Sequence, residues 1–227
     1  MLRVRQLGPG YFGITMQTSL NTVARRSAGQ VSQPRQGRAV ATRERLLDVA
    51  GQLLGEVGVE RISTNLICAR AGMTPPALYR YFKDKYGVLE ALGQRLMDRQ
   101  NAVLFEWLDR HAPGGLATLS EGVELLLRAT ADVTASEPGA IWTLRALRAV
   151  PQLAHVRIAS HRLVTDRMAQ VYAPLLPDMP PEVLWRRLRL SVEFGFAADE
   201  MLNEETLIPR DDLMRDAAAI LRHAIAP

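Results

Sequence analysis

Residues 62–85 read ISTNLICARAGMTPPALYRYFKDK, and this stretch decides the fold. Ser63 or Thr64 can cap a short helix, because a hydroxyl oxygen accepts a hydrogen bond from a free amide of the first turn. Ile67 then faces inward, and Gly72 ends the helix, since glycine readily takes the left-handed conformation found at helix ends. The first half of the stretch therefore predicts one short helix and a tight turn.

A second short helix follows the glycine turn. Thr74 can cap it, and the two prolines behind Thr74 suit a first helical turn, where the amides have no intrahelical partners anyway. Two short helices at this spacing predict a helix-turn-helix whose second member, residues 75–82, enters the major groove of DNA. Leu78 and Phe82 are expected to be core residues.

Longer helices are predicted on both sides of this unit. Apolar residues recur at three- and four-residue spacing from Thr42 onward, and Gly58 can end that helix. Asp84 can cap a long helix that ends before Pro113. Its apolar residues are Val88, Leu89, Leu92, Leu96, Val103, Leu104 and Trp107.

Several side chains of the helix-turn-helix are candidate DNA contacts. Tyr79 and Tyr81 offer hydroxyl groups to phosphates, and Arg80 can contact a phosphate or a guanine. Lys85 lies at the start of a helix, where its charge and the helix dipole both favour a phosphate. Small or flat residues let the second helix approach base edges closely. They are Pro75, Pro76 and Ala77.

The same stretch resembles the signature of the TetR family of transcriptional regulators, over roughly residues 40–92. That signature runs from a Thr-capped short helix through Ala-Gly-Val to Leu-Tyr-x-x-Phe and a lysine that opens the next helix. The matching residues here are Ala71-Gly72-Met73, Leu78-Tyr79-Arg80-Tyr81-Phe82 and Lys85. The resemblance implies that Thr64 contacts a phosphate and that Asn65 reads a base, plausibly adenine. With these two, the predicted DNA-binding residues are Thr64, Asn65, Thr74, Pro75, Pro76, Ala77, Tyr79, Arg80, Tyr81 and Lys85.

The stretch departs from the family pattern at three places. Cys68 stands where a small residue such as alanine is usual, and we expect a small buried side chain there rather than a redox sensor. Leu66 occupies a position that is often polar. Pro75-Pro76 supplies no side-chain hydrogen bonds, so base reading must depend more on Asn65, Tyr79 and Arg80.

The rest of the chain also has helical periodicity. Five more helices are expected, over residues 116–136, 138–150, 151–172, 181–205 and 209–226. The predicted fold is all-α with about nine helices, and convincing β-branched alternation is absent from the sequence. We expect a basic arm at 1–38, a helix-turn-helix domain of three helices at 39–86, and a helical effector-binding and dimerisation domain at 87–227.

Charge is distributed unevenly along the 227 residues. The net charge is +4, but residues 1–38 contain six arginines and no acidic residue, so the remainder carries −2. Such an arm suits a polyanion such as DNA. The alternative is an unstructured leader, with Met16 as the true first residue.

Other classes of protein are disfavoured. The single cysteine permits no intramolecular disulfide, and no uncharged apolar run reaches the length of a membrane span. The four histidines lack metal-ligand spacing, and no phosphate loop or nucleophile elbow is present. Four acidic residues could serve as acid and base, but a solvated face or subunit contacts are the favoured interpretation. They are Glu193, Asp199, Glu200 and Glu204. No catalytic residue, metal or cofactor is predicted, and an enzyme is the least favoured class.

The resemblance also implies a small-molecule pocket and a dimer interface in residues 110–227. The candidate pocket residues are Trp107, Trp142, Met168, Tyr172 and Phe194, although each could be an ordinary core residue. Arg145, Arg148 and Arg157 could select an anionic ligand or lie on the surface. The candidate interface residues are Leu184, Leu188, Val192, Gly195 and Ala198 in one helix and Leu213, Ala217, Ile220 and Ala224 in the next. The competing interpretation is that both apolar stripes pack inside one subunit.

The predicted function is a cytoplasmic, homodimeric regulator that binds a partly palindromic operator in double-stranded DNA. A repressor that an unidentified small-molecule effector releases is favoured. An activator or a ligand-independent regulator of the same fold is one alternative. A helical ligand-binding protein that has lost DNA binding is another.

Overall fold

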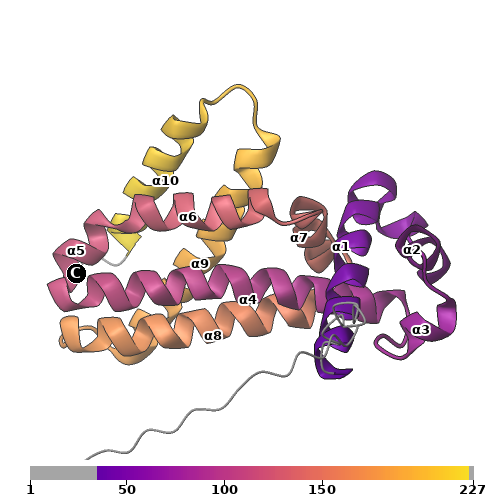
Figure 1. Cartoon of the computed structure of the whole chain (residues 1–227). Helices are drawn as coiled ribbons and strands as arrows, with labels where there is room; N and C mark the ends of the chain where they lie inside the picture. The colour runs from indigo at the N-terminus through magenta and orange to yellow at the C-terminus, as the bar shows by residue number, and fades with distance from the viewer. Residues whose placement is uncertain (1–34, 225–227) are drawn as a thin grey trace, which may run out of the picture.

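The computed structural model describes residues 35–224, and this part of the chain is all-α, as predicted. It contains no strand among those residues, and ten α-helices follow one another (Figure 1). They are α1 (Arg35–Arg61), α2 (Thr64–Ala71), α3 (Pro75–Tyr79), α4 (Lys85–His111), α5 (Gly115–Glu121), α6 (Val123–Ser136), α7 (Ala140–Ala149), α8 (Ala154–Tyr172), α9 (Pro181–Glu204) and α10 (Arg210–Ala224).

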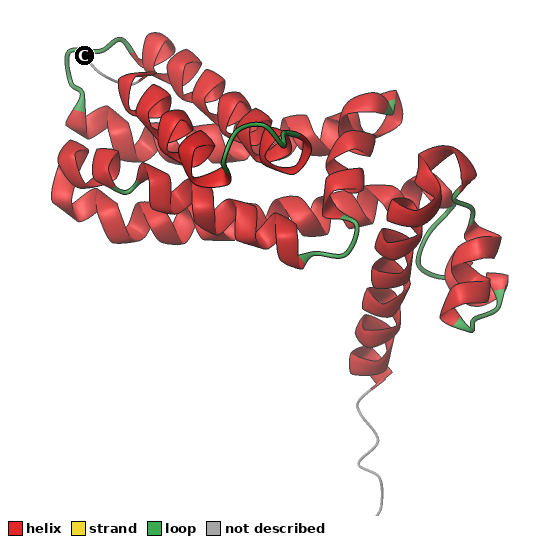
Figure 2. Ribbon diagram, turned by 90° about the horizontal axis from the view of Figure 1, so that it is seen from above, coloured by secondary structure: helices red, strands yellow, loops and turns green. Residues whose placement is uncertain are grey.

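The helices form two groups. Helices α1–α3 lie together at one end of the molecule, which we call the head (Figures 1 and 2). Helices α5–α10 and most of α4 form the body, in which α4 and α8 run side by side along the long axis. Because α4 begins in the head and ends in the body, it connects the two groups directly.

Most of the predicted helix limits agree with the structure, and the differences have local causes. Helix α1 begins at Arg35, seven residues before the predicted Thr42, while residues 1–34 of the predicted basic arm lie outside the described part of the chain. Gly58 does break α1, with a φ of 74°. Helix α3 ends at Tyr79 rather than at residue 82, because a turn follows in which the Tyr81 amide donates to the Leu78 carbonyl oxygen.

A glycine divides the predicted helix 116–136 into α5 and α6. The Trp107 indole nitrogen donates a hydrogen bond of 2.9 Å to the carbonyl oxygen of Gly122. A Cβ atom at Gly122 would lie only 2.8 Å from that nitrogen and 2.7 Å from the ring of His111. Only glycine therefore lets the chain approach α4 this closely.

Three apolar clusters hold the helices together. The first fills the head and continues into the body, because Leu144 and Leu147 of α7 pack in it with the residues of α1–α4. The second lies among α4, α8 and α9 and contains Trp107 and Leu188. The third joins α6, α9 and α10 around Met214. The head is thus attached to the body by a shared core and not by a linker.

The contact between head and body is tightest where α1 meets the α6–α7 corner. A Cβ atom on Gly51 would lie 2.2 Å from the carbonyl oxygen of Pro138, and one on Gly139 would lie 2.0 Å from the Gly51 carbonyl oxygen. Gly139 also has a left-handed φ of 69°. Backbone therefore packs directly against backbone at this point, so a displacement of the corner must also displace α1.

Candidate nucleic-acid interface and internal cavity

Helix α2 is fixed at both ends by the residues expected to do so. Ser63 is the N-cap, and its hydroxyl oxygen accepts a hydrogen bond of 3.2 Å from the Leu66 amide. Gly72 follows the last turn with a φ of 64°, and the Met73 amide donates to the Cys68 carbonyl oxygen at 2.9 Å. This pair of bonds satisfies carbonyl groups that the helix end leaves open, so the turn into α3 is well defined.

Helix α3 is short and held by its buried side. Leu78 is fully buried and Phe82 nearly so, as predicted, and both belong to the first cluster. Thr74 occupies the N-cap position, but its hydroxyl makes no capping hydrogen bond. That hydroxyl is exposed and available to an external acceptor.

The predicted contact residues of α2 and α3 lie mainly on one exposed surface. Thr64 Oγ1 and the Tyr79 hydroxyl oxygen are 3.1 Å apart, so the start of α2 and the end of α3 are linked. Asn65 and Arg80 are exposed. Pro75 and Pro76 are exposed as well, and Ala77 is half-buried. The surface combines polar groups that can bind phosphates with a flat apolar start of α3.

Two of the predicted contacts have additional structural roles. The half-buried Tyr81 packs against the first cluster, with its ring centroid 6.3 Å from that of Phe82, so its ring is a structural element. The Lys85 ammonium donates a hydrogen bond of 3.2 Å to the carbonyl oxygen of Val59. Lys85 therefore ties α4 to the end of α1, while its ammonium has three N–H donors in total.

The electrostatics of this surface favour an anion. Residues 63–86 contain four basic side chains and one acidic side chain, Asp84. The Asp84 carboxylate is occupied, since it accepts a hydrogen bond of 2.9 Å from the Gly87 amide as the N-cap of α4. Arg70 forms a bidentate pair with Glu56 of α1, and hydrogen bonding to Arg70 lowers the pKa of Glu56.

Cys68 is a core residue, as expected. It is 2% exposed, and burial raises the pKa of its thiol. A buried thiol with a raised pKa is a poor nucleophile and a poor redox sensor.

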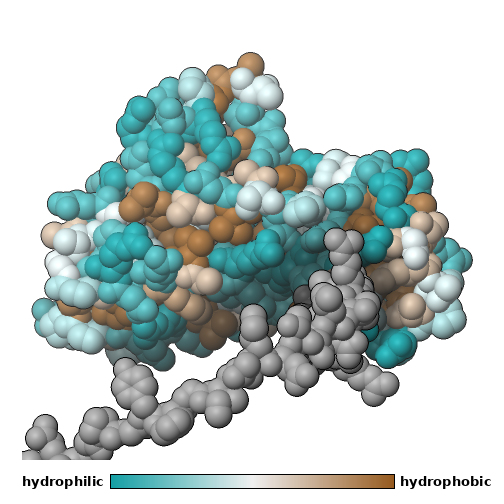
Figure 3. Space-filling model, viewed as in Figure 1, coloured by the Kyte–Doolittle hydropathy of each residue, from teal (hydrophilic) through white to brown (hydrophobic). Residues whose placement is uncertain are grey.

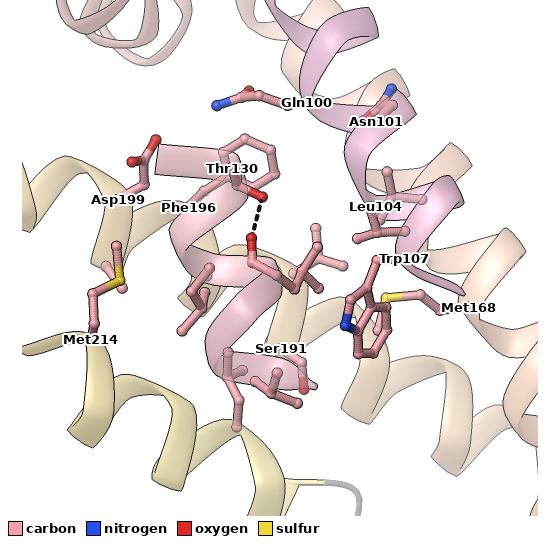
Figure 4. A pocket seen from close by; sticks show the side chains of 18 of the residues that line it. Gln100, Asn101, Leu104, Trp107, Thr130, Met168, Ser191, Phe196, Asp199 and Met214 are labelled. Carbon is pink, nitrogen blue, oxygen red and sulfur yellow. Dashed lines mark hydrogen bonds between the residues drawn. The ribbon is translucent and has the colours of Figure 1, made fainter. Parts of the chain in front are cut away.

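The body contains an internal cavity of about 90 Å³ among α4, α6, α8, α9 and α10 (Figure 4). Three of the five predicted pocket residues line it: Trp107, Met168 and Tyr172. Most of the wall is apolar, as is usual for small-molecule sites. Burial raises the pKa of Tyr172 to about 12, so its hydroxyl is uncharged.

The other two predicted pocket residues lie elsewhere. Trp142 is 42% exposed on α7, with its indole ring 4.7 Å from the Arg145 guanidinium carbon. Phe194 packs against the third cluster, whereas Phe196, two residues later, lines the cavity. Helical periodicity shows which residues share a face, but not whether that face meets a cavity, solvent or another helix.

Sequence reasoning missed the polar residues of the cavity. Gln100 Nε2 donates to Thr134 Oγ1 at 3.0 Å, and Thr134 Oγ1 donates to Asp199 Oδ2 at 2.6 Å. Gln100 and Asp199 line the cavity, and both are almost fully buried. Asp199 was expected on a solvated or intersubunit face, so that expectation is wrong.

One sequence signal could have identified Asp199. It lies 15, 11 and 7 residues after Leu184, Leu188 and Val192, and therefore extends their buried stripe on α9. An acidic residue in a buried apolar stripe is rare without a functional or structural partner.

A chain of polar contacts leads from the cavity toward the head. Three residues beyond Thr134, the Glu137 carboxylate pairs with Arg95 and Arg99 of α4, and it is only 1% exposed. Arg95 also pairs with Glu44 and Asp48 of α1, at 3.0 and 2.8 Å. The C-terminal end of α6 is thus joined by charge to α1.

The remaining predicted acidic residues pair with arginines outside the cavity wall. Arg145 pairs with Glu204, and Arg148 pairs with Glu193 and Glu200. Arg157 donates to Glu193 at 2.9 Å. These arginines are therefore used in ion pairs between helices and do not line the cavity.

Glu193 also holds a buried histidine. His161 Nδ1 lies 3.0 Å from Glu193 Oε2, and the imidazole stacks on Phe196 with a centroid distance of 4.2 Å. Burial lowers the pKa of His161 to about 4, and the hydrogen bond to Glu193 offsets only part of that effect. Burial alone would raise the pKa of Glu193, but hydrogen bonds from Arg189 and His161 outweigh it and lower the pKa to about 2. Among the described residues, no group of three or more His, Cys, Asp or Glu could hold a metal ion.

Most of the predicted interface residues of α9 pack inside the chain. Leu184, Leu188 and Val192 belong to the second cluster, and Ala198 belongs to the third. Gly195 lines the cavity. The apolar stripe that the sequence assigned to a subunit interface is therefore the inner face of α9.

A different face of α9 is apolar and accessible. Leu190 and Met201 are exposed, at 65% and 40%, and with Phe194 and Ala197 they lie on one side of the helix. In α10, Ala217 is buried, Leu213 and Ala224 are half-buried, and Ile220 is 55% exposed.

Apolar residues are also exposed on the side of the molecule seen in Figure 3. They gather along α6 and at the tip of the α9–α10 loop. The exposed large side chain of α6 is Leu125, and those of the loop are Leu207 and Ile208. In the described part of the chain, no helix is both long enough and apolar enough to cross a membrane.

Comparisons with known proteins agree on one family. A family model described as "Bacterial regulatory proteins, tetR family" matches residues 46–92. The tetracycline repressor protein class C of Escherichia coli is 38% identical over 55 residues, which are 24% of this chain and 25% of that protein. The HTH-type transcriptional regulator UidR of Escherichia coli K12 is 24% identical over 189 residues, which are 81% of this chain and 89% of that protein. The crystal structure of a TetR-family transcriptional regulator from Streptomyces coelicolor shares the fold, with a TM-score of 0.52 at 24% identity. It covers 81% of this chain and 97% of that one.

Proposed function

We propose that this chain, a DNA-binding transcriptional regulator of the TetR family, acts as a homodimeric repressor that a small-molecule effector releases from its operator. The observation that carries this proposal is the pairing of an exposed helix-turn-helix with an apolar cavity in one chain. A regulator of this kind needs no catalytic group, and it works in the cytoplasm, where bacterial DNA lies.

The head supports direct reading of DNA. Asn65 and Arg80 are exposed, and their side chains can form paired hydrogen bonds with adenine and guanine. Thr64, Tyr79 and Thr74 present hydroxyl groups that suit phosphates. The prolines at the start of α3 add no hydrogen bonds there, but they leave room for close approach to bases.

Selection from a pool of random DNA duplexes tests this part of the proposal. The full chain should enrich one sequence with two related half-sites about one helical turn apart, because two reading heads are needed for tight specific binding. Failure to enrich any sequence at moderate salt would favour a ligand-binding protein that has lost DNA recognition.

A dimer is supported by the accessible apolar faces of α9 and α10. Phe194 packs against the third cluster, which contains Ala217 and Met214 of α10, so the two helices lie against each other. Two helices from each protomer would form a four-helix interface about a twofold axis. Leu190, Met201 and Ile220 would then be covered by the partner copy.

Sedimentation at micromolar concentration tests the dimer. Wild-type protein should sediment as a dimer, while Leu190→Glu should give folded monomers with poor operator affinity, since its side chain is exposed in the single chain. The control is Leu163→Glu on α8. Leu163 is exposed too, at 53% against 65% for Leu190, but it lies outside α9 and α10. A wild-type monomer would refute the dimer mechanism.

Effector release is supported by the path from the cavity to α1. Thr134 is hydrogen-bonded to Asp199, which lines the cavity, and Glu137 follows the end of α6 three residues later. Glu137 pairs with Arg95, which in turn pairs with carboxylates of α1. The following residues, Pro138 and Gly139, touch Gly51. A ligand that moves the end of α6 would change the position of α1 and hence the spacing of the two reading heads.

A reporter assay separates the repressor from its alternatives. With the selected operator placed over a promoter, a repressor should lower transcription, and deletion of the gene should raise it. Higher transcription in the presence of the protein would identify an activator. An operator affinity that no cavity ligand changes would identify a ligand-independent regulator.

A further inference from the structure

The cavity has an apolar part and a polar edge. Trp107, Leu104 and Met168 lie together on one side in Figure 4, while Gln100 and Asp199 lie along another edge, among α4, α6 and α9. Two oxygen atoms at that edge lack a hydrogen-bond partner within the described part of the chain. They are Gln100 Oε1 and Asp199 Oδ1, on side chains only 2% and 4% exposed.

The hydrogen-bond chain at this edge leaves two acceptor oxygens without a partner. The Thr134 hydroxyl has a single proton, and Asp199 Oδ2 is its nearer acceptor, at 2.6 Å against 3.3 Å for the Thr130 carbonyl oxygen. The Gln100 atom that faces the same hydroxyl must therefore be the amide nitrogen, at 3.0 Å. This fixes the orientation of the Gln100 amide and leaves its oxygen without a partner.

The polar edge also lacks a positive charge. No lysine, arginine or histidine is among the residues that line the cavity. Burial raises the pKa of Asp199 to about 6, against the weaker opposing effects of Thr134 and Arg210. At neutral pH the carboxylate is still mostly ionised, and a buried charge without an ionic partner is costly.

We infer that the cavity selects a small hydrophobic amine, whose ammonium group binds Asp199 Oδ1 and Gln100 Oε1 and whose apolar body packs on Trp107 and Met168. The size of the ligand follows from the volume. A cavity needs about 10–15 Å³ of this volume to hold one water molecule. The 90 Å³ here therefore has room for roughly six to nine atoms of that size, and benzylamine has about eight non-hydrogen atoms. The inference rests on the proposed role of this cavity as the effector site, and it assigns the chemical class of the effector.

Calorimetric titration of the full chain at neutral pH tests this class with three probes of one shape. Benzylamine carries a positive charge, benzyl alcohol is a neutral donor and benzoate is an anion. Benzylamine should bind about tenfold more tightly than benzyl alcohol or better, because hydrogen bonds between charged groups are stronger than those with a neutral partner. Benzoate should not bind, since its charge repels Asp199.

Substitution of the carboxylate should abolish the preference. Asp199→Asn keeps the shape of the side chain, and it should bring the affinities for benzylamine and benzyl alcohol within about threefold of each other. Gln100→Met removes the second acceptor and should weaken benzylamine binding by a smaller factor. The control is Glu200→Gln, which removes the adjacent carboxylate; Glu200 pairs with Arg148 outside the cavity wall.

Three results would overturn the inference: no binding of benzylamine, equal affinity for the amine and the alcohol in the wild type, or a preference for the amine that survives Asp199→Asn. Circular dichroism of each variant checks that it is folded. DNA binding is measured separately on the same preparation. A protein that binds duplex DNA but ignores benzylamine refutes only the amine inference. One that binds benzylamine through Asp199 but selects no duplex refutes only the proposed regulatory function.

Discussion

The head and the body differ in the buried polar groups that they contain. Among the described residues of α1–α3, no polar or charged residue is buried, so no buried side chain there lacks a hydrogen-bond partner. In the body, several do, on Arg95, Gln100, Arg157, His161 and Asp199. The Arg95 Nη2 and Glu137 Oε1 atoms are also without a regular hydrogen bond, but they form an ion pair with each other.

This difference matches what each region has to do. The head must keep one shape against DNA, and its core is a closely packed set of apolar side chains. In the body, the unsatisfied oxygens of Gln100 and Asp199 cost free energy that a ligand in the cavity can recover by supplying a partner. A ligand that recovers it in only one arrangement of α6 and α9 shifts the protein toward that arrangement.

The ion pair at the boundary between the regions should have the largest effect on stability. Glu137→Ala leaves the mostly buried Arg95 without its partner in the body, and removal of one member of a buried pair costs about 3–5 kcal/mol. Urea denaturation measures the free energy of unfolding. Glu204→Ala is the control, because the Arg145–Glu204 pair is exposed and should contribute less than about 1 kcal/mol. Similar losses in both variants would show that the boundary pair has no special role.

The buried carboxylate of the cavity should destabilise the protein in a pH-dependent way. The pKa of Asp199 is about 6 in the folded chain, against 3.8 for an isolated aspartate, so the folded state binds the proton more tightly. Protonation of Asp199 therefore stabilises the folded state in full below pH 4, and this stabilisation is lost as the pH rises to about 6. The difference between the two pKa values corresponds to a free energy of about 3 kcal/mol.

Asp199→Asn removes this titration. The variant should be more stable than the wild type at pH 7 by up to about 3 kcal/mol, and the gain should shrink toward pH 4. Thermal or urea unfolding at several pH values measures it. If the variant and the wild type were equally stable at pH 7 as well as at pH 4, Asp199 would be adequately solvated or paired, and the contrast with the head would not hold.

Sequence reasoning predicted the head more closely than the body because the signals of the head are local. Ser63, Gly72 and Asp84 act within a few residues of themselves, and each ends or begins a helix as expected. The end of α3 was misplaced, since it depends on how Phe82 enters the core and not on a terminating residue.

In the body, the same kind of pattern did not show what each helix face packs against. Leu184 and Leu188 recur as an interface stripe would, but their neighbours are in the same chain. Trp142 was an acceptable pocket residue by composition and lies on the surface. Which face of α9 meets α8, the cavity or another protomer depends on contacts distant in sequence, and periodicity carries no information on them.

Base-reading residues should affect specificity by a moderate amount. Asn65→Ala and Arg80→Ala should each reduce discrimination between the selected operator and single-base variants by about 1–3 kcal/mol, at different positions of the site. Fluorescence anisotropy with a set of point-substituted duplexes measures this loss. Equal losses on operator and random DNA would mean that the residue contacts only the backbone.

Lys85 should have the smallest effect, and it tests whether the head is as rigid as its apolar core suggests. Its ammonium donates to the Val59 carbonyl oxygen, while its remaining donors can reach a phosphate. Lys85→Ala should weaken binding to all duplexes alike and lower the salt dependence of binding by about one unit, as expected for the loss of one phosphate contact. Lys83→Ala, next to the same helix start and exposed, is the matched control. If the hydrogen bond to Val59 also orients α1, Lys85→Ala but not Lys83→Ala should lower the free energy of unfolding, by about 0.5–1.5 kcal/mol. A change in operator preference with Lys85→Ala would contradict a phosphate role, since backbone contacts carry no sequence information directly.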